Sequence, residues 1–401
     1  MPEFNPEDKN NPRILGLPKN IFFLGLTSFF NDFSSEMVFS VFPAFFTSVL
    51  RAGAGALGLV DGIAEGLSNF FKIYSGALSD KFQKRKFLVV SGYALSVVTR
   101  PFYVLAATVS GALGLRVLDR VGKGLRDAPR DAIISLSTPK AEMGKSFGYH
   151  RAMDTAGSIL GPLVAYLILR KFPLHFNTVF MTAFFVGLAA IFSLVFISDI
   201  ALRPSARNLK FFNSFRRLSS RFKIFIAAVF ILSIGSLPIV VMLLKTQSIG
   251  LIIADIPLFY MIYSLSYAAF SISAGKMSDR AGAKKVIFIG YTILLVSYFF
   301  LSQAASFWAL AASFLFLGLF PALTDGIQRS LASKLTSNET RGSALGMLNA
   351  AVGIGALLAG IVGGYLWQHY GPTLTFSVAG VFVIIGLILL SLVRPAEADV
   401  D

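Results

Sequence analysis

The chain has 401 residues, of which 55% are hydrophobic and only 14% are charged, and its formal net charge is +15. Soluble domains carry about 25% charged residues, so this composition excludes an ordinary soluble domain and indicates a membrane protein. The basic residues cluster between apolar runs, which favours cytoplasmic loops over a nucleic-acid surface. The absence of cysteine excludes disulfides and thiol chemistry.

Apolar segments long enough to cross a hydrocarbon core of about 30 Å recur along the whole sequence. They predict an all-α membrane protein of twelve transmembrane helices, six on each side of a basic linker. Ser236 and Pro238 predict a bend in the seventh helix. The predicted ranges are 20–48, 55–78, 87–107, 109–137, 143–169, 174–199, 223–247, 256–278, 285–304, 306–335, 341–368 and 372–393.

Lys and Arg concentrate in alternate loops and in the linker, so the positive-inside rule places both termini in the cytoplasm. The polar N-terminus does not have the features of a cleavable signal peptide, and we expect the first helix to be retained. The expected parts are a cytoplasmic N-terminal tail (1–19), an N-terminal six-helix bundle (20–199), a cytoplasmic linker (200–222), a C-terminal six-helix bundle (223–393) and a cytoplasmic tail (394–401).

Two unrelated stretches of the first half recur in the second half at nearly the same distance. The run from Gly76 to Lys81 recurs as Gly275 to Arg280, at an offset of 199 residues. The run from Gly148 to Ala152 recurs as Gly346 to Ala350, at an offset of 198 residues. This pattern indicates a duplicated six-helix unit, and parallel repeats around a site at mid-membrane are typical of transporters.

The loop after the second helix resembles the signature of the major facilitator superfamily, in which a glycine, a leucine and an aspartate precede a basic cluster. Gln83 stands where the signature has a glycine. The resemblance extends over essentially the whole chain and implies two six-helix repeats with both termini in the cytoplasm. The first copy is carried by Gly76, Leu78, Asp80, Lys81, Lys84 and Arg85, and the second by Gly275, Asp279, Arg280, Gly282 and Lys284.

Two weaker patterns also resemble that superfamily. Arg120 and Gly124 match an Arg-x-x-x-Gly pattern of proton-coupled members, in the fourth helix. In the fifth helix, a glycine-proline pattern resembles that of proton-exchanging exporters, although Ala165 replaces its closing glycine. The residues that match it are Gly157, Gly161 and Pro162, which we assign to close helix packing.

The resemblance places Asp80 against the N-terminus of the eleventh helix, near residues 341–343. A carboxylate there stabilises the unsatisfied N–H groups by about 0.3–2 kcal/mol and favours an outward-open state. Arg85 is a candidate partner for Asp131, and the alternative is that residues 81–86 only set the topology. The predicted cytoplasmic gate comprises Gly76, Asp80, Arg85, Arg126, Asp127, Arg130, Asp131, Asp279 and Arg280.

The stretch 116–131 packs five basic and three acidic residues into the fourth helix. Each charge facing lipid would cost about 2.5–3.5 kcal/mol, so this helix must turn inward. We expect its outer turns, with Arg116, Asp119, Arg120 and Lys123, to face a cavity and its inner turns to form the gate.

Pairs of acids lie four residues apart on the first two helices, and such spacing places each pair on one face. Asp32 and Glu36 either carry protons or are neutralised by a base of the fourth helix. Asp61, which precedes Glu65, is interpreted as structural.

On the fifth helix, Asp154 is expected to pair with Arg151 or with a base of the fourth helix. His150 on the same face is either a titrating group or a hydrogen-bonded structural histidine. In the second half, Asp325 and Arg329 predict a pair at i,i+4 spacing. The candidate residues for substrate binding and proton coupling are Asp32, Glu36, Arg116, Arg120, Lys123, His150 and Asp154.

These features predict a secondary active transporter that moves a small polar or anionic solute by alternating access, with proton coupling and export by antiport favoured. The alternatives are proton-coupled import of an organic acid or siderophore, multidrug efflux, sodium coupling and a channel. A membrane-embedded lipid-modifying enzyme would need a cluster of catalytic side chains, which three dispersed histidines do not provide. The chain has no P-loop motif for nucleotides.

We therefore expect no enzymatic activity, no cofactor and no metal site. The expected partners are a small-molecule substrate, protons and the lipid bilayer, without nucleic acid. The expected location is the cytoplasmic (inner) membrane of a bacterium, as a multi-pass monomer.

Overall fold

The computed structural model describes residues 12–82, 85–139, 142–198, 218–336 and 341–393. Its first half consists of six long helices, which agree with the predicted ranges within a few residues. A 3-10 turn at Tyr103–Leu105 follows the third of them. The helices are α1 (Lys19–Ser48), α2 (Ala54–Phe82), α3 (Arg85–Phe102), α4 (Val109–Leu136), α5 (Met143–Lys171) and α6 (Phe176–Val195).

The second half repeats this arrangement, with two of its predicted helices modified by a proline or a glycine. A 3-10 turn at Ile253–Asp255 precedes α11. The helices are α8 (Ser220–Ile234), α9 (Ile239–Leu243), α10 (Lys245–Ser248), α11 (Ile256–Ala281), α12 (Ala283–Gln303), α13 (Phe307–Lys334) and α14 (Arg341–Ser391).

The predicted seventh helix is interrupted rather than only bent. α8 ends at Ile234, and Pro238 is the N-cap of α9, where the missing N–H of a proline costs no helical hydrogen bond. The helix α14 contains a kink at Gly371, whose φ of 81° is outside the helical region and is followed by Pro372. The kink falls at the predicted boundary between 341–368 and 372–393, so α14 comprises the last two predicted helices.

The part of the predicted N-terminal tail that the structure describes is folded. Strands β1 (Arg13–Ile14) and β2 (Leu17–Pro18) form an antiparallel hairpin in which Ile14 pairs with Leu17. Leu15 and Gly16 of its turn both have a positive φ, and the carbonyl of Gly16 accepts a hydrogen bond from Lys145 of α5 at 3.0 Å. The hairpin therefore docks on α5 at the start of α1.

Among the described residues, eight helices are long and apolar enough to cross a membrane by length and composition, and one of them is the kinked span Gly342–Ser391. The chain is therefore a multi-pass membrane protein. The helices α1, α2 and α4 are not among these eight; each carries acidic residues within its span, and α4 carries several basic residues as well.

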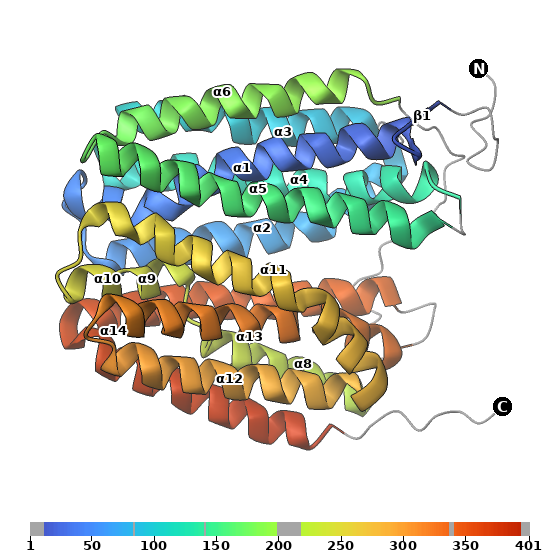
Figure 1. Ribbon diagram of the computed structural model, residues 1–401. Coiled ribbons are helices and arrows are strands. Elements are labelled where there is room, and N and C mark those ends of the chain that lie inside the picture. Colours follow the sequence, from blue (N-terminus) through green and yellow to red (C-terminus); the bar gives the residue numbers. More distant parts are fainter. Residues whose placement is uncertain (1–11, 83–84, 140–141, 199–217, 337–340, 394–401) are drawn as a thin grey trace.

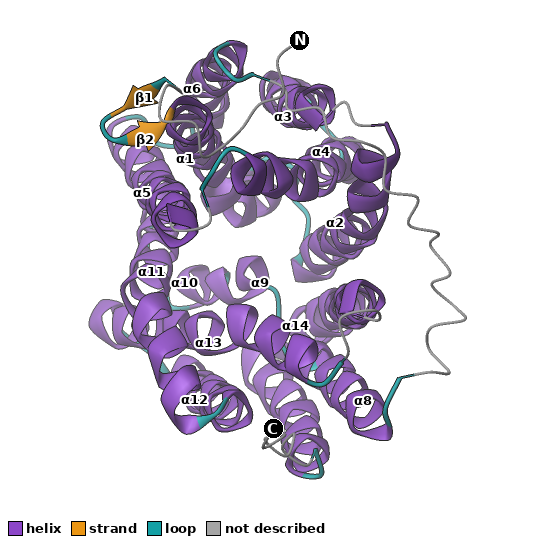
Figure 2. Ribbon diagram, turned by 90° about the vertical axis from the view of Figure 1, so that its right-hand side faces the viewer, coloured by secondary structure: helices purple, strands orange, loops and turns teal. Residues whose placement is uncertain are grey.

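Figure 1 shows α1–α6 packed above α8–α14, with the helices of both halves running lengthwise. The helix α1 begins and α14 ends at the same end of the molecule, on the right of Figure 1, which we call the terminal end. The opposite end, where α1 ends and α2 begins, is called the far end. Figure 2 looks at the terminal end, so the helices of both halves are seen end-on.

The two halves pack directly on one another at the far end. The seam runs between α2 and the first part of α14, where glycines allow the backbones to approach closely. A Cβ atom on Gly58 would collide with the carbonyl oxygen of Gly360, and a Cβ on Gly364 would lie 2.6 Å from the carbonyl oxygen of Ala54. Two hydrogen bonds add to the closure, from Gln247 to Thr47 at 2.8 Å and from the Gly55 N–H to Gln368 at 3.0 Å.

Candidate functional site

A cavity of about 740 Å³ lies between the two halves, in the part of the molecule nearer the terminal end. Its walls come from α1, α2, α4 and α5 on one side and from α11, α13 and α14 on the other. Six carboxylates and six basic side chains line it. They are Asp32, Asp127, Asp131, Asp154, Asp279 and Asp325, and Lys72, Lys123, Arg126, Arg130, Arg151 and Arg329.

Three of the seven predicted substrate and proton-coupling residues line this cavity, namely Asp32, Lys123 and Asp154. Five predicted gate residues line the same cavity rather than a separate layer. They are Arg126, Asp127, Arg130, Asp131 and Asp279. Glu36, Arg116, Arg120, His150 and Arg280 are not among its lining residues. The surroundings of Gly76 and the side chains of Asp80 and Arg341 lie outside the described part of the chain.

The outer turns of α4 pair with α2 instead of facing the cavity. Arg116 contacts Asp61 at 2.8 Å and Arg120 contacts Glu65 at 3.1 Å, and further along Lys72 lies 4.0 Å from Asp127. Each pair joins residues 55 positions apart, so the two helices run in parallel with a constant register. The expectation that Arg116 and Arg120 face the cavity is therefore wrong, and the structural interpretation of Asp61 fits its buried ion pair.

The same two arginines also contact aromatic rings of α1. The guanidinium carbon of Arg116 lies 4.2 Å from the centroid of the Phe39 ring, and that of Arg120 lies 5.4 Å from it. Asp119 adds a longer contact to Arg116, at 3.6 Å. The ion pairs with α2, the cation–π contacts with α1 and the burial of both arginines together hold the outer turns of α4 in place between α1 and α2.

Asp32 is connected to a buried arginine that the sequence analysis did not identify. Arg100 of α3 is 2% exposed and donates to the side-chain oxygen of Asn31 at 2.9 Å. The amide nitrogen of Asn31 donates in turn to Asp32 at 3.1 Å. Because a guanidinium only donates, Arg100 fixes the orientation of the Asn31 amide and hence the donor offered to Asp32.

Glu36 joins the two halves of the molecule. Its carboxylate accepts a hydrogen bond of 2.7 Å from the hydroxyl of Tyr260 on α11. In the described part of the chain, no Lys or Arg nitrogen lies within 4.0 Å of Glu36, and the same holds for Asp32. The neutralising base of the fourth helix that was considered for these two acids is thus not in contact with them.

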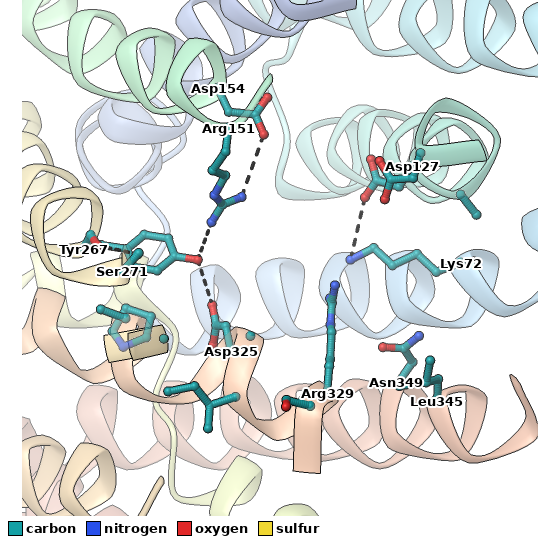
Figure 3. Close-up of a pocket in the computed structure, with 18 of the residues that line it drawn as sticks. Lys72, Asp127, Arg151, Asp154, Tyr267, Ser271, Asp325, Arg329, Leu345 and Asn349 are labelled. Atoms are coloured by element: carbon teal, nitrogen blue, oxygen red, sulfur yellow. Dashed lines mark hydrogen bonds and ion pairs between the residues drawn. The ribbon is translucent and has the colours of Figure 1, made fainter. Parts of the chain in front are cut away.

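A second polar chain crosses between the halves inside the cavity (Figure 3). Arg151 of α5 donates to the hydroxyl of Tyr267 at 2.6 Å, and this hydroxyl donates to Asp325 at 3.4 Å. Arg151 also lies 3.8 Å from Asp154, which confirms the predicted pairing of Asp154. Ser28 of α1 donates to the other oxygen of Asp154.

The hydrogen bond from Tyr267 to Asp325 takes the place of a predicted ion pair. The expected pair between Asp325 and Arg329 does not form within 4.0 Å, because the Asp325 carboxylate is directed to Tyr267 on α11. His150 is buried with its Nδ1 3.9 Å from Asp154, too far for a hydrogen bond.

The predicted gate residues on α4 have partners on their own and neighbouring helices. Arg130 contacts Asp131 at 2.9 Å and Asp127 at 3.6 Å, so Asp131 pairs with Arg130 rather than with Arg85. Arg126 donates to Ser96 at 2.7 Å and lies over the ring of Tyr93, at 4.4 Å.

The predicted packing glycines hold α5 close to α1. A Cβ on Gly157 would collide with the carbonyl oxygen of Phe29, and a Cβ on Gly161 would lie 3.0 Å from the backbone nitrogen of Met37. Pro162 is buried within α5. This close approach places Asp154 next to Ser28 and thereby fixes one wall of the cavity.

Comparison with known proteins gives one consistent result. The sequence profile of the Major Facilitator Superfamily (MFS) matches residues 24–251 and 224–400. An uncharacterized MFS-type transporter of Methanocaldococcus jannaschii is 37% identical over 389 residues, with 95% of this chain and 97% of the relative covered. The multidrug resistance protein MdtH of Photorhabdus laumondii is 32% identical over 121 residues, 29% of this chain and 30% of the relative. The solved structure of the nucleoside transporter NupG has a TM-score of 0.79 at 16% identity, covering 94% of this chain and 100% of that chain.

Proposed function

This chain belongs to the major facilitator superfamily of membrane transporters, and we propose that it moves a small polar or anionic solute by proton-coupled alternating access. The cavity between the two halves carries the proposal. It is lined by both halves, is rich in charged groups, and is separated from the far end by direct packing of α2 on α14. A site of this kind at the interface of two repeats is what rocking of one half against the other would expose to each side in turn.

The distribution of Lys and Arg among the loops supports placing the terminal end in the cytoplasm, in the cytoplasmic membrane of the cell. The conformation is then inward-open. Transport would require the far-end contacts to separate, including the hydrogen bond between Gln247 and Thr47 and the glycine seam around Gly58. The terminal end would close over the solute at the same time.

Asp32 and Glu36 support the coupling to protons. A carboxyl group without a fixed counter-ion exchanges a proton at lower cost than one held in a tight ion pair. Asp61 and Glu65 are held in such pairs with Arg116 and Arg120, so we assign them to structure. Glu36 has the additional property that its hydrogen bond to Tyr260 joins the halves, so its protonation state and the relative position of the halves would be linked.

Export in exchange for protons is the favoured direction, because the glycine and proline residues of α5 match most of the exporter pattern. Multidrug efflux is supported by partial similarities to the multidrug proteins MdtH and PmrA, which cover 29% and 43% of this chain. A cavity lined by twelve charged side chains suits a polar solute better than a lipophilic drug.

The test is solute flux in proteoliposomes with and without an imposed pH gradient, against a panel of organic acids, siderophores, phosphorylated compounds and drugs. We expect Asp32→Asn and Glu36→Gln to retain solute binding and exchange but to lose the response to the gradient. Tyr260→Phe should reduce gradient-driven flux about tenfold or more, the effect of a lost hydrogen bond to a charged group. Glu142→Gln, which removes only a surface contact to Arg13, is the matched control. Gradient-driven flux that persists in both acid variants would refute the proton-carrying roles.

A further inference from the structure

Two basic side chains in the cavity have no partner. In the described part of the chain, neither Lys123 on α4 nor Arg329 on α13 makes a hydrogen bond or an ion pair within 4.0 Å. The register between α2 and α4 explains the first case. Arg120 meets Glu65 at an offset of 55 residues, whereas the same offset places Ser68 opposite Lys123. No acid of α2 is therefore available to Lys123.

A third basic side chain, Lys72, converges with these two. Its ammonium group extends from α2 into the cavity and points toward the guanidinium group of Arg329, which rises from α13 in the other half (Figure 3). The charges of both Lys123 and Arg329 act electrostatically on Lys72. Asn349 of α14 lies beside Arg329 and adds an amide to the same wall.

The acids that line this side of the cavity form their contacts with other groups. Asp127, at 4.0 Å from Lys72, and Asp131 share Arg130 between them, so these two acids balance Lys72 and Arg130. Asp325 is bonded to Tyr267 on the opposite side of the cavity. Among the described residues, Lys123 and Arg329 are thus left without an ion pair within 4.0 Å.

We propose that Lys72, Lys123 and Arg329, with Asn349 beside them, form a subsite for a compact dianionic oxyanion group of the phosphate-monoester type on the transported solute. This inference rests on the proposed transport function and names the chemical class of its solute. Three basic groups, two of them without an ion pair, suit a dianion; Lys acts on phosphate as a point charge, and the fork of Arg binds two oxygens at once.

The subsite also explains why solute binding would change the conformation. Lys72 and Lys123 belong to the first half and Arg329 to the second. Without an anion, their mutual repulsion opposes closure of the terminal end. With a dianion between them the sign of the interaction reverses, so the loaded carrier closes and the empty carrier stays open.

The first experiment measures binding of inorganic phosphate to the purified full-length protein, without a gradient. Phosphate should bind saturably, and more tightly at pH 8 than at pH 6, because it becomes a dianion between these values. Lys72→Gln and Arg329→Gln should each weaken binding about tenfold or more. Lys276→Gln on α11, outside the cavity, is the matched control, and Arg329→Lys should retain part of the affinity.

The outcomes separate this inference from the proposed function. Binding that depends on Lys72 and Arg329, together with flux that ignores a pH gradient, would leave the subsite standing and remove proton coupling. Flux of a solute that persists unchanged in Arg329→Gln would remove the subsite and leave transport intact. Failure of phosphate to bind, or acetate competing as well as phosphate, would overturn the assignment of a dianion.

Discussion

The glycine seam at the far end makes a direct test of alternating access possible. In Gly58→Ala, the added Cβ atom would collide with the carbonyl oxygen of Gly360 and lie 3.0 Å from the Cα of Gly364. Both neighbours are backbone atoms, so neither can rotate away. The strain exists only while the far end is closed, because opening separates α2 from α14.

Overpacking of a tight interface costs about 1–3 kcal/mol. Applied to one of two states, this penalty changes their equilibrium by about 5- to 150-fold, since 1.4 kcal/mol corresponds to a factor of ten. Gly58→Ala should therefore shift the protein strongly toward the state that is open at the far end. Gly114→Ala is the control, because among the described atoms nothing lies within 4 Å of its added Cβ.

The cysteine-free sequence supplies the assay. A single Ser271→Cys in the cavity wall reports which side of the membrane reaches the cavity, through its reaction with a membrane-impermeant thiol reagent applied from either side. The ratio of the two labelling rates should change by the stated factor in Gly58→Ala and by much less in Gly114→Ala. An identical ratio in the two variants would show that the glycine seam does not separate in transport.

Two further predictions concern buried arginines. Arg116→Gln leaves Asp61 buried without its partner and should lower the free energy of unfolding by about 3–5 kcal/mol in chemical denaturation, whereas Arg13→Gln at an exposed pair should cost less than about 1 kcal/mol; equal losses would contradict the structural role. Arg100→Met should leave thermal stability unchanged or higher, since an apolar side chain of similar size replaces a buried charge, yet should alter the pH dependence of transport by releasing Asn31. Arg100→Lys should restore part of the normal pH profile, and a wild-type profile in Arg100→Met would exclude the positioning role.

Helix positions were predictable because every membrane-spanning helix needs about twenty consecutive, mainly apolar residues. Even the division of α14 could be located, since Gly371 and Pro372 interrupt an otherwise continuous apolar run. The interruption at Pro238 was predicted as a bend only. Proline indicates where a helix is disturbed, whereas the packing around it determines whether the helix bends or stops.

Side-chain partners were less predictable, because periodicity gives the face of a helix and not the neighbour of that face. Asp325 and Arg329 have the spacing of a pair, but Tyr267 from another helix takes the carboxylate. Arg100 was missed although it is the only charged residue in the predicted span 87–107. A lone arginine in an apolar helix must be satisfied by a neighbouring helix, and that signal alone would have identified it as a buried contact.

The charges of α4 follow a pattern that can also be found in the sequence. On α2, Asp61, Glu65 and Lys72 are separated by four and seven residues, and on α4 Arg116, Arg120 and Asp127 have the same spacing with the opposite sign. Two parallel helices in constant register therefore neutralise one another at three levels.

Lys123 and Arg126 both lie between the second and third levels of α4. Arg126 donates to Ser96 of α3, whereas Lys123 faces a serine position of α2 in this register. The three ion pairs between α2 and α4 do not include it. A cation in the cavity that its own bundle leaves without an ion pair suits an anion from outside the protein, and for this reason we propose the transported solute as its partner.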